Sequence, residues 1–251
     1  MLELRHITAG YPNCAVLEDL TLTLHPGQVS ILVGPNGCGK STLLKTLAGI
    51  LPLQDGNILL DGTDLSTLSG QQRAQQIAYL PQNRPVPDIT VERMILHGRF
   101  PYLGYPRKYR AEDYAVAQAA MTRMEISDLA KQPVASLSGG TRQKVYIAMA
   151  LAQDTPVILM DEPTTFLDIG HQIQMMDTAR TLAKQGKTVV LVLHDLPMAM
   201  EYADRLILMQ SGRISAADAP EAVFNTGKLT EVFGVAMQRT MTQHGWKYYF
   251  A

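Results

Sequence analysis

Cysteine is scarce in this sequence: only Cys14 and Cys38 occur among 251 residues. Two cysteines cannot build the disulfide framework on which many small secreted domains depend, so a reducing cytosol is the natural setting. No apolar run reaches the roughly 18 residues that a bilayer-spanning helix needs. The opening residues, MLELRH, also lack the basic-then-apolar layout of a secretory signal. We therefore expect a soluble chain that stays in the cytosol.

An excess of charge of one sign is missing as well. Lys and Arg number 22 against 23 Asp and Glu, which gives a formal net charge of -1 at pH 7. Such a chain has no basic surplus with which to hold a nucleic-acid backbone, so we expect no nucleic-acid partner. Repeats, low-complexity tracts and long linkers are also absent. The length suffices for one large domain with a substantial core, and we predict a single domain over residues 1–251.

What is present is organised around residues 34–41, which read GPNGCGKS and match the GxxxxGK[ST] phosphate-binding loop. The apolar run at 29–33 is typical of a buried strand, and the leucine spacing at 42–48 favours a helix, which is the context that the motif needs. Glycines let backbone N–H groups and the positive helix end approach a polyphosphate. Lys40 adds a positive charge near the terminal phosphates. The Ser41 hydroxyl can ligate the Mg²⁺ that accompanies ATP.

The predicted nucleotide-binding residues of this loop are Gly34, Pro35, Asn36, Gly37, Cys38, Gly39, Lys40, Ser41 and Thr42. The alternative is a glycine-rich surface turn with a stray lysine. That alternative does not account for the strand and the helix on either side.

Two kinds of secondary-structure pattern occur around this loop, one typical of strands and one typical of helices. Alternating apolar and polar residues at 2–8 and 16–24 favour half-buried antiparallel strands with turn residues at 10–13 between them. Helical patterns from about residue 88 to 155 predict an inserted helical lobe. Further strands are expected at 56–62, 77–80, 157–160 and 188–193, and hairpins at 205–216 and at 237–250, with His244-Gly245 at the centre of the second. The runs 157–160 and 188–193 are continuously apolar, as in a parallel sheet covered on both faces.

The strand at 157–160 ends in two acids, Asp161 and Glu162. Neighbouring strand residues point to opposite faces of a sheet, so the two carboxylates cannot do the same job. We expect Asp161 to face the phosphate loop and hold Mg²⁺. Glu162 is expected to face the γ-phosphate and polarise the attacking water. Without a phosphate loop, the same pair would read as the surface cap of a strand.

Residues 137–140, LSGG, precede an apolar helical pattern and so lie at a helix N-terminus. Free N–H groups and the helix dipole make this a second candidate anion site. Ser138 alone is equally well explained as a helix N-cap. Gly139 and Gly140 are not explained that way, because glycine weakens the first turn of a helix.

The order of these motifs resembles the nucleotide-binding subunit of an ABC transporter over nearly the whole chain. The series runs through the phosphate loop, Gln82 after a strand, the LSGG stretch, Asp161-Glu162, Leu167-Asp168 and His194 after a buried strand. The resemblance implies an α/β fold of the P-loop NTPase type, with a RecA-like parallel-sheet core, an N-terminal antiparallel β subdomain and an inserted α-helical subdomain. It also implies a head-to-tail pair of copies, in which each ATP lies between the phosphate loop of one copy and the LSGG stretch of the other.

The resemblance assigns roles residue by residue. Lys40, Gln82, Glu162 and His194 would be catalytic; Ser41, Gln82 and Asp161 would hold Mg²⁺; and Ser138, Gly139, Gly140, Thr141 and Asp168 would act on the nucleotide of the second copy. Tyr11 would stack on adenine. Thr141 departs from the usual glutamine and has a shorter reach. Plain structural explanations stay open for three of these residues: Tyr11 packing a turn, Gln82 ending a strand and His194 following one.

A narrower resemblance is to the ATPases of importers for ferric siderophores, haem and cobalamin, carried by the stretches HGRFPY, IAMALAQ and EPTTFLDIGHQ. It implies an ATP-hydrolysing subunit at the cytoplasmic face of the membrane, with ATP and Mg²⁺ as cofactors. Its partners would be two transmembrane permease subunits and, indirectly, a periplasmic or lipoprotein substrate-binding protein. Because the cargo does not touch this subunit in such systems, cargo identity rests on analogy. Phe100, Tyr102, Leu103 and Tyr105 would form a socket for a partner helix, or else the helical lobe's own core.

Two other function classes stay open. A soluble ABC ATPase acting on ribosomes or DNA would usually carry two nucleotide domains or a coiled-coil insertion, and this sequence has neither. A P-loop kinase would have no use for a second anion site at Ser138.

Overall fold

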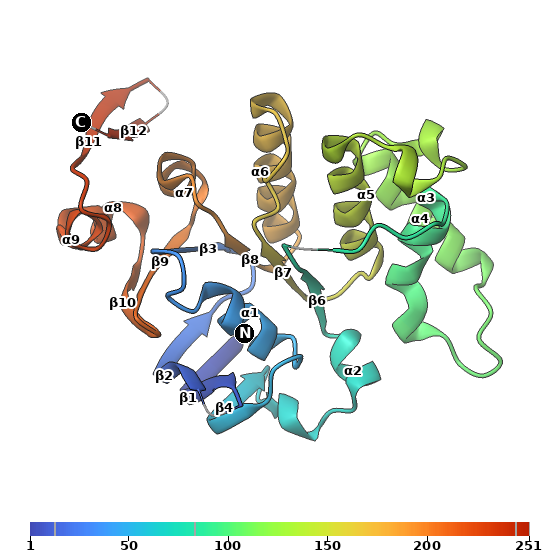
Figure 1. The fold of residues 1–251 in the computed structure, drawn as a ribbon, viewed down its shortest axis with the longest axis horizontal. Helices are drawn as coiled ribbons and strands as arrows, with labels where there is room; N and C mark the ends of the chain where they lie inside the picture. Colours follow the sequence, from blue (N-terminus) through green and yellow to red (C-terminus); the bar gives the residue numbers. More distant parts are fainter. Residues whose placement is uncertain (13, 83, 244, 251) are drawn as a thin grey trace.

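The computed structural model describes residues 1–12, 14–82, 84–243 and 245–250. The predicted turn residue Asn13 and the hairpin centre His244 therefore lie outside the described residues. Two sheets lie one above the other in Figure 1, with helices above and to the right of the larger sheet.

The larger sheet has six strands in the order β10-β9-β3-β8-β7-β6. They are β3 (Val29–Val33), β6 (Ile77–Leu80), β7 (Val157–Asp161), β8 (Thr188–Val192), β9 (Arg205–Gln210) and β10 (Arg213–Asp218). All neighbours pair in parallel except β10, which pairs antiparallel with β9. Every residue of β3, β7 and β8 is buried, as continuously apolar strands of a doubly covered sheet should be.

The smaller sheet is antiparallel, in the order β2-β1-β4-β5. Its strands are β1 (Leu2–Tyr11), β2 (Cys14–Leu24), β4 (Leu53–Leu60) and β5 (Thr63–Asp64). The predicted strands here are confirmed, but they are longer than the sequence pattern indicated. β4 begins at Leu53 because it continues its pairing with β1 as far as Ala9, across a register shift that alternation alone does not reveal.

Nine helices occur among the described residues. They are α1 (Lys40–Leu47), α2 (Gly70–Ala74), α3 (Val91–Leu96), α4 (Ala111–Arg123), α5 (Gly139–Ala152), α6 (Ile169–Lys184), α7 (Leu196–Tyr202), α8 (Pro220–Asn225) and α9 (Lys228–Phe233). Short 3-10 turns are η1 (Leu65–Thr67), η2 (His97–Tyr102), η3 (Ser127–Leu129) and η4 (Val134–Ser136). Helices α3, α4 and α5 pack on one another at the right of Figure 1 and form the helical lobe that the sequence predicted.

Alternate residues of the central strands feed two separate cores. Ile158 and Met160 of β7 join one core with the helical lobe, α6 and α7. Val157 and Leu159 join the other core with α1 and the antiparallel sheet. Successive side chains of a strand point to opposite faces of the sheet. One face therefore packs against the helical lobe, α6 and α7, and the other packs against α1 and the antiparallel sheet.

Parallel pairing brings the carboxyl ends of β3, β6, β7 and β8 to one edge of the sheet. The phosphate loop follows β3, Gln82 follows β6, Glu162 follows β7 and His194 follows β8. In open α/β sheets this edge is where ligands bind, so the topology gathers motifs that are far apart in the sequence.

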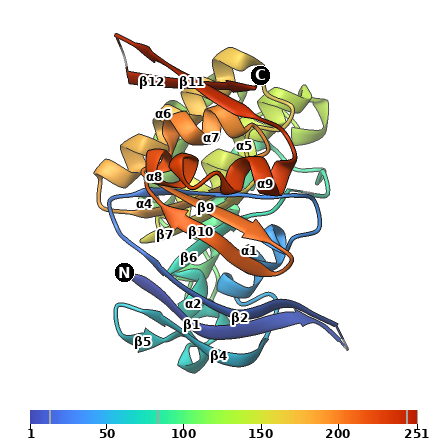
Figure 2. The ribbon, with the colours of Figure 1, turned by 90° about the vertical axis from the view of Figure 1, so that its left-hand side faces the viewer.

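The predicted C-terminal hairpin is formed by β11 (Met237–Thr242) and β12 (Gly245–Phe250), which pair antiparallel. Figure 2 shows this hairpin beside α7, at the opposite end of the molecule from the antiparallel sheet. Among the described residues, none of the helices combines the length and the apolar character needed to cross a bilayer.

Candidate nucleotide-binding site

The phosphate loop needs glycine at two positions for reasons of space. A Cβ on Gly34 would lie 2.2 Å from the Met209 carbonyl oxygen, and one on Gly39 would lie 2.9 Å from Leu17. Gly39 is also the N-cap of α1 and has a φ of 106°. Strand β9 and the antiparallel sheet therefore pack closely against the loop at these two positions. Only glycine, which has no Cβ, fits there.

Lys40 is 6% exposed, so its ammonium lies inside the loop and not on the surface. The Nζ donates hydrogen bonds to the Gly34 and Pro35 carbonyl oxygens at 2.7 and 3.0 Å. The Cys38 sulfur is 4.0 Å from the same nitrogen. A charge held by its own loop is already desolvated and is positioned to meet an anion at the loop's mouth.

A cavity of about 350 Å³ opens at this edge of the sheet. Its lining residues are Asn36, Gly37, Gly39, Lys40, Ser41, Thr42, Gln82, Glu162 and His194. The structure thus brings together phosphate-loop residues and all four predicted catalytic side chains. Tyr11, the predicted adenine contact, is outside this lining; its phenol oxygen accepts a hydrogen bond from Lys45 Nζ at 3.4 Å.

Asp161 ends β7 and is 2% exposed. Burial raises the pKa of its carboxyl, while a hydrogen bond from Ser41 opposes that shift. Among the described residues its Oδ1 is buried and has no hydrogen-bond partner. A buried carboxylate oxygen beside a hydroxyl is costly unless a cation meets it, so this donor set fits Mg²⁺.

The described residues contain no cluster of three or more His, Cys, Asp or Glu able to hold a metal ion. The candidate Mg²⁺ ligands are accordingly a mixed set: the Ser41 hydroxyl, the Gln82 amide and the Asp161 carboxylate. Such a set suits an ion that keeps part of its water shell and shares its coordination with phosphate oxygens.

Glu162 lies just past β7 and has a φ of 52°. Gln82 Nε2 donates to its Oε2 at 2.7 Å, and Thr165 Oγ1 reaches the same oxygen at 3.4 Å. Its Oε1 accepts from His194 Nε2. Because a carboxylate only accepts, that imidazole nitrogen carries the proton. Gln82 and His194 thus hold the carboxylate from two sides at the wall of the cavity.

The LSGG stretch starts α5, with Ser138 as its N-cap. The Ser138 oxygen accepts from the Thr141 backbone N–H at 3.3 Å and lies 2.9 Å from the Thr141 hydroxyl. A Cβ added to Gly140 would lie 3.4 Å from the Phe166 carbonyl oxygen. Ser138 is therefore a helix N-cap, which was the alternative explanation for this residue. Gly140, in the same helix start, packs against the segment that follows Glu162.

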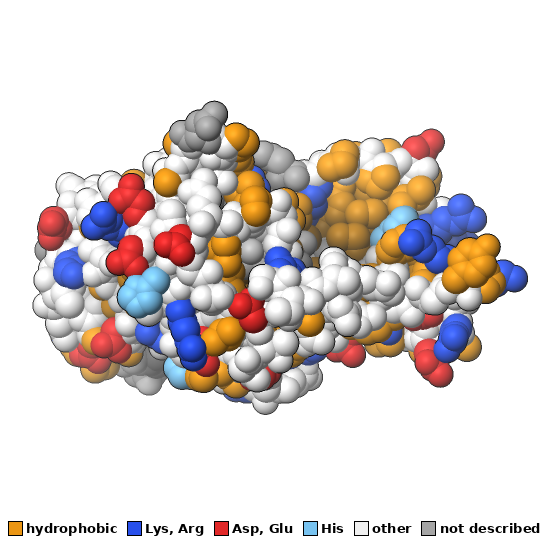
Figure 3. Space-filling view, turned by 90° about the horizontal axis from the view of Figure 1, so that it is seen from below, with side chains coloured by type: hydrophobic (Ala, Val, Ile, Leu, Met, Phe, Trp, Pro, Cys, Tyr) orange, Lys and Arg blue, Asp and Glu red, His pale blue; other side chains and the backbone are white. Residues whose placement is uncertain are grey.

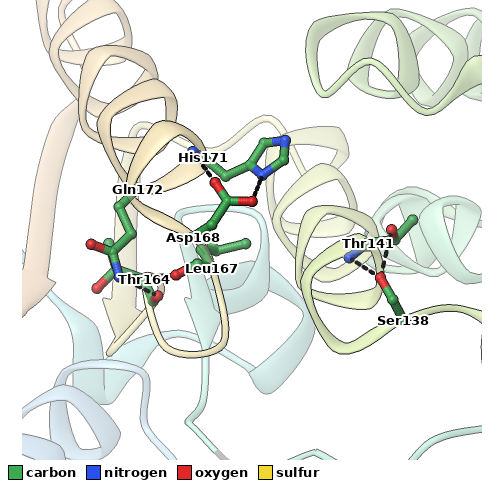
Figure 4. Close-up of polar contacts among 7 residues, drawn as sticks. All are labelled: Ser138, Thr141, Thr164, Leu167, Asp168, His171 and Gln172. Carbon is green, nitrogen blue, oxygen red and sulfur yellow. Dashed lines mark hydrogen bonds and ion pairs between the residues drawn. The ribbon is translucent and has the colours of Figure 1, made fainter.

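Figure 4 shows this helix start beside that of α6, where Asp168 is the N-cap. Asp168 accepts from the His171 backbone N–H at 3.0 Å and contacts the His171 Nδ1 at 2.8 Å. These hydrogen bonds, the backbone one first, hold the pKa of Asp168 below its usual value. Gln172 Nε2 donates to the Leu167 and Thr164 carbonyl oxygens at 3.0 and 3.4 Å.

His171 and Gln172 were missed as supports of the Asp168 segment. For His171 the signal was available in the sequence, because an N-cap residue commonly pairs with the residue three positions later. None of Ser138, Gly139, Gly140, Thr141 and Asp168 lines the phosphate-loop cavity of the same chain.

A glycine-rich loop between a buried strand and a helix, a buried carboxylate beside Ser41 and a held glutamate in one cavity define a P-loop nucleoside triphosphatase. The comparison with known families narrows this class. Residues 17–165 match the ABC transporter family. The chain belongs to that family, as an ATP-binding subunit, and is an ATPase.

Three relatives illustrate the similarity. The achromobactin transport ATP-binding protein of Dickeya dadantii is 42% identical, with 92% of this chain and 87% of the relative covered. The ferric enterobactin transport ATP-binding protein of Escherichia coli is 40% identical, with 91% and 85% covered. The hemin import ATP-binding protein of Rhodococcus jostii is 43% identical, with 87% and 75% covered.

The solved structures that resemble this chain also include ABC transporter subunits. A metal-chelate type ABC transporter in an inward-facing conformation superposes with a TM-score of 0.84 at 28% identity, over 100% of this chain and 96% of the other. A dimeric bacterial ABC transporter cassette superposes with a TM-score of 0.76 at 28% identity, over 88% and 99%. The predicted fold class is confirmed: a parallel-sheet core, an antiparallel β subdomain and an inserted helical subdomain.

Proposed function

We propose that this chain is the ATP-hydrolysing subunit of an importer that takes up an iron chelate of the siderophore class. It would act at the cytoplasmic face of the cell membrane, bound to two transmembrane permease subunits and served by a periplasmic or lipoprotein substrate-binding protein. The observation that carries the ATPase part is the Glu162 carboxylate, held by Gln82 and His194 at the wall of the phosphate-loop cavity. The cargo is supported by the names of the relatives.

The proposed chemistry assigns one task to each group. Backbone N–H groups of the loop and the Lys40 ammonium bind the phosphates of ATP. Mg²⁺, held by Ser41, Gln82 and Asp161, would neutralise phosphate charge. Glu162 orients and polarises the attacking water, and His194 keeps the Glu162 carboxylate turned toward it. Gln82 contacts both the water and Glu162, so a movement of the loop that carries Gln82 changes the rate.

A head-to-tail dimer completes the site in this proposal. Ser138, Gly139, Gly140, Thr141 and Asp168 would meet the ATP held by the second copy, and Tyr11 would stack on the adenine of its own. Support comes from the position of the LSGG stretch, which is outside the cavity of its own chain. Phe166, next to that stretch, is 80% exposed, as an apolar side chain at an interface would be in the isolated chain. Thr141 is turned onto Ser138, so it reaches less far than the family's usual glutamine.

The membrane partner is proposed to dock between the two lobes. Figure 3 shows a hollow lined by hydrophobic side chains on the side of the helical lobe. A groove of about 440 Å³ lies between the end of α1, α2 and the Gln153 end of α5. Tyr102 belongs partly to the lobe, since it donates to the Gln153 carbonyl and carries the Arg99 guanidinium on its ring. Tyr105 is 100% exposed and is therefore free to meet a partner.

Tyr105→Asp is expected to abolish capture by the permease subunits in a pull-down while leaving the thermal melting temperature unchanged, because a fully exposed side chain supports no packing. Tyr249→Asp, in the distant C-terminal hairpin, serves as the control and should retain capture. Equal capture of both variants would contradict docking at this place.

The cargo prediction can be checked by uptake in cells that lack this chain. Uptake of a radioiron-labelled ferric siderophore should be lost, and the wild-type chain should restore it while Glu162→Gln should not. Hemin, cobalamin and free metal ions are the alternative cargoes, and rescue of one of these without rescue of the ferric siderophore would replace the present assignment. Co-purification with ribosomes instead of membranes would favour a soluble ABC ATPase.

The chain is proposed to form one domain over residues 1–251, with the helical subdomain at approximately 88–155. Support comes from the hydrogen bonds of Gln71 and Gln75 to the Pro101 carbonyl and of Gln153 to the Ala74 and Ile77 carbonyls, which bind the two lobes together.

A further inference from the structure

The segment after β6, which we call the Gln82 loop and define as the described residues 81–82 and 84–86, is bound to α5 through Arg84. Arg84 Nε donates to the Pro81 carbonyl oxygen at 2.6 Å, and Arg84 Nη2 donates to Gln143 Oε1 at 3.1 Å. The guanidinium carbon lies 4.4 Å from the centre of the Tyr146 ring. A planar guanidinium can make all three contacts together, whereas a lysine ammonium cannot.

Tyr146 binds the same loop at a second point, Pro85. Its hydroxyl donates to the Pro85 carbonyl oxygen at 2.9 Å. The Arg84 side chain is part-buried, and burial lowers its pKa to about 10, so the guanidinium stays charged at neutral pH. The Pro81 carbonyl is thus held by Arg84, which stacks on Tyr146 of α5, and the Pro85 carbonyl is held by Tyr146 itself.

Gln143 continues the connection to the catalytic segment. This side chain is 6% exposed, and its Nε2 donates to the Pro163 carbonyl oxygen at 2.7 Å. Pro163 directly follows Glu162, whose carboxylate accepts from Gln82. Arg84, Gln143 and Pro163 thus link the Gln82 loop, the helix that begins with the LSGG stretch and the chain segment that carries Glu162.

We propose that Arg84 is a positioning residue, which keeps the Gln82 amide on the Glu162 carboxylate and ties both to α5 through Gln143. Binding of ATP is left to the phosphate loop, with which Arg84 makes no hydrogen bond among the described residues. The inference rests on the roles of Gln82 and Glu162 proposed above.

The test is a double-mutant cycle on the steady-state ATPase of the full chain, with Arg84→Met, Gln82→Ala and the combined variant. Arg84→Met should lower kcat by about tenfold, with the KM for ATP changed less than twofold. In the Gln82→Ala background, Arg84→Met should lower kcat no further, because the positioned group is already gone. Arg180→Met is the matched control, since Arg180 also stacks on a tyrosine, Tyr202, and donates to a backbone carbonyl, but far from the cavity.

The outcomes distinguish a failure of the role assigned to Gln82 from a failure of the positioning role proposed for Arg84. A Gln82→Ala variant with wild-type kcat would remove the assignment of Gln82 and this inference with it. A lowered kcat in Gln82→Ala, combined with an equal further loss on adding Arg84→Met, would overturn the inference alone, since additivity means that Arg84 does not act through Gln82. A fall in Arg180→Met as large as in Arg84→Met would also overturn it.

Gln143→Glu tests the second link separately. Glutamate keeps an acceptor for Arg84 but cannot donate to the Pro163 carbonyl, so kcat should fall while the KM for ATP holds. Circular dichroism and a melting curve on the same sample establish that the variant is folded. A folded variant with wild-type kcat would overturn the Gln143 link.

Discussion

Glu162→Gln should lower ATP turnover by about 10²- to 10⁴-fold, which is the range for removing a general base. The amide preserves the size of the side chain but cannot take up a proton from water, and its Nε2, which is itself a donor, must face a donor from Gln82 or His194. The variant should still bind ATP, because the phosphate loop is untouched. With hydrolysis blocked, two ATP molecules should remain enclosed between two copies of the chain.

Size-exclusion chromatography with light scattering measures this result directly. Glu162→Gln should elute as a dimer with ATP and Mg²⁺ and as a smaller species without nucleotide. Glu18→Gln, which removes an exposed carboxylate paired with Arg213, is the matched control and should behave as the wild type. Only monomers of Glu162→Gln in saturating ATP would exclude the proposed paired sites.

Lys40→Ala should weaken ATP binding by about 10- to 150-fold, since hydrogen bonds to charged groups contribute about 1.5–3 kcal/mol. The loss should be large for an ammonium that is 6% exposed, because water screens it little. Isothermal titration calorimetry with ATP and Mg²⁺ measures the affinity. The expected loss lies in binding itself, in contrast to the loss of turnover in Glu162→Gln.

The control for Lys40→Ala is Lys187→Ala. Lys187 likewise donates to a backbone carbonyl, that of Thr155, and sits away from the cavity. Lys40→Ala leaves two carbonyl oxygens and Lys187→Ala one without an ammonium partner, so comparison of their melting temperatures separates a stability effect from a binding effect. Wild-type ATP affinity in a folded Lys40→Ala variant would count against the phosphate role of this lysine.

Several features of the fold follow from local pattern. The phosphate loop was predictable because glycine spacing, a buried strand and a helix all lie within about twenty residues of sequence. The parallel core was predictable because continuously apolar strands such as β8 need cover on both faces. Strand ends were less predictable, since the start of β4 depends on its pairing with β1.

The site residues likewise were predictable only in part from the sequence. The sequence named Gln82, Glu162 and His194 as separate residues after separate strands, and the structure joined them through the Glu162 carboxylate. Tyr11 stays a predicted adenine contact, and in the structure its phenol oxygen accepts a hydrogen bond from Lys45 outside the cavity lining. Arg84 and Gln143 carried no motif at all, since neither belongs to a pattern that repeats at a fixed spacing.

The sequence by itself determined which segments become strands, where the glycine-rich loop lies and which carboxylates follow β7, because turn chemistry and hydrophobic period act over neighbouring residues. Only the tertiary structure decided which side chains hold Glu162 and how the Gln82 loop is fastened to α5. Those contacts join residues separated by up to 80 positions in the chain, as Gln82 and Glu162 are. Their geometry is set by the packing of strands and helices against one another, which no local pattern encodes.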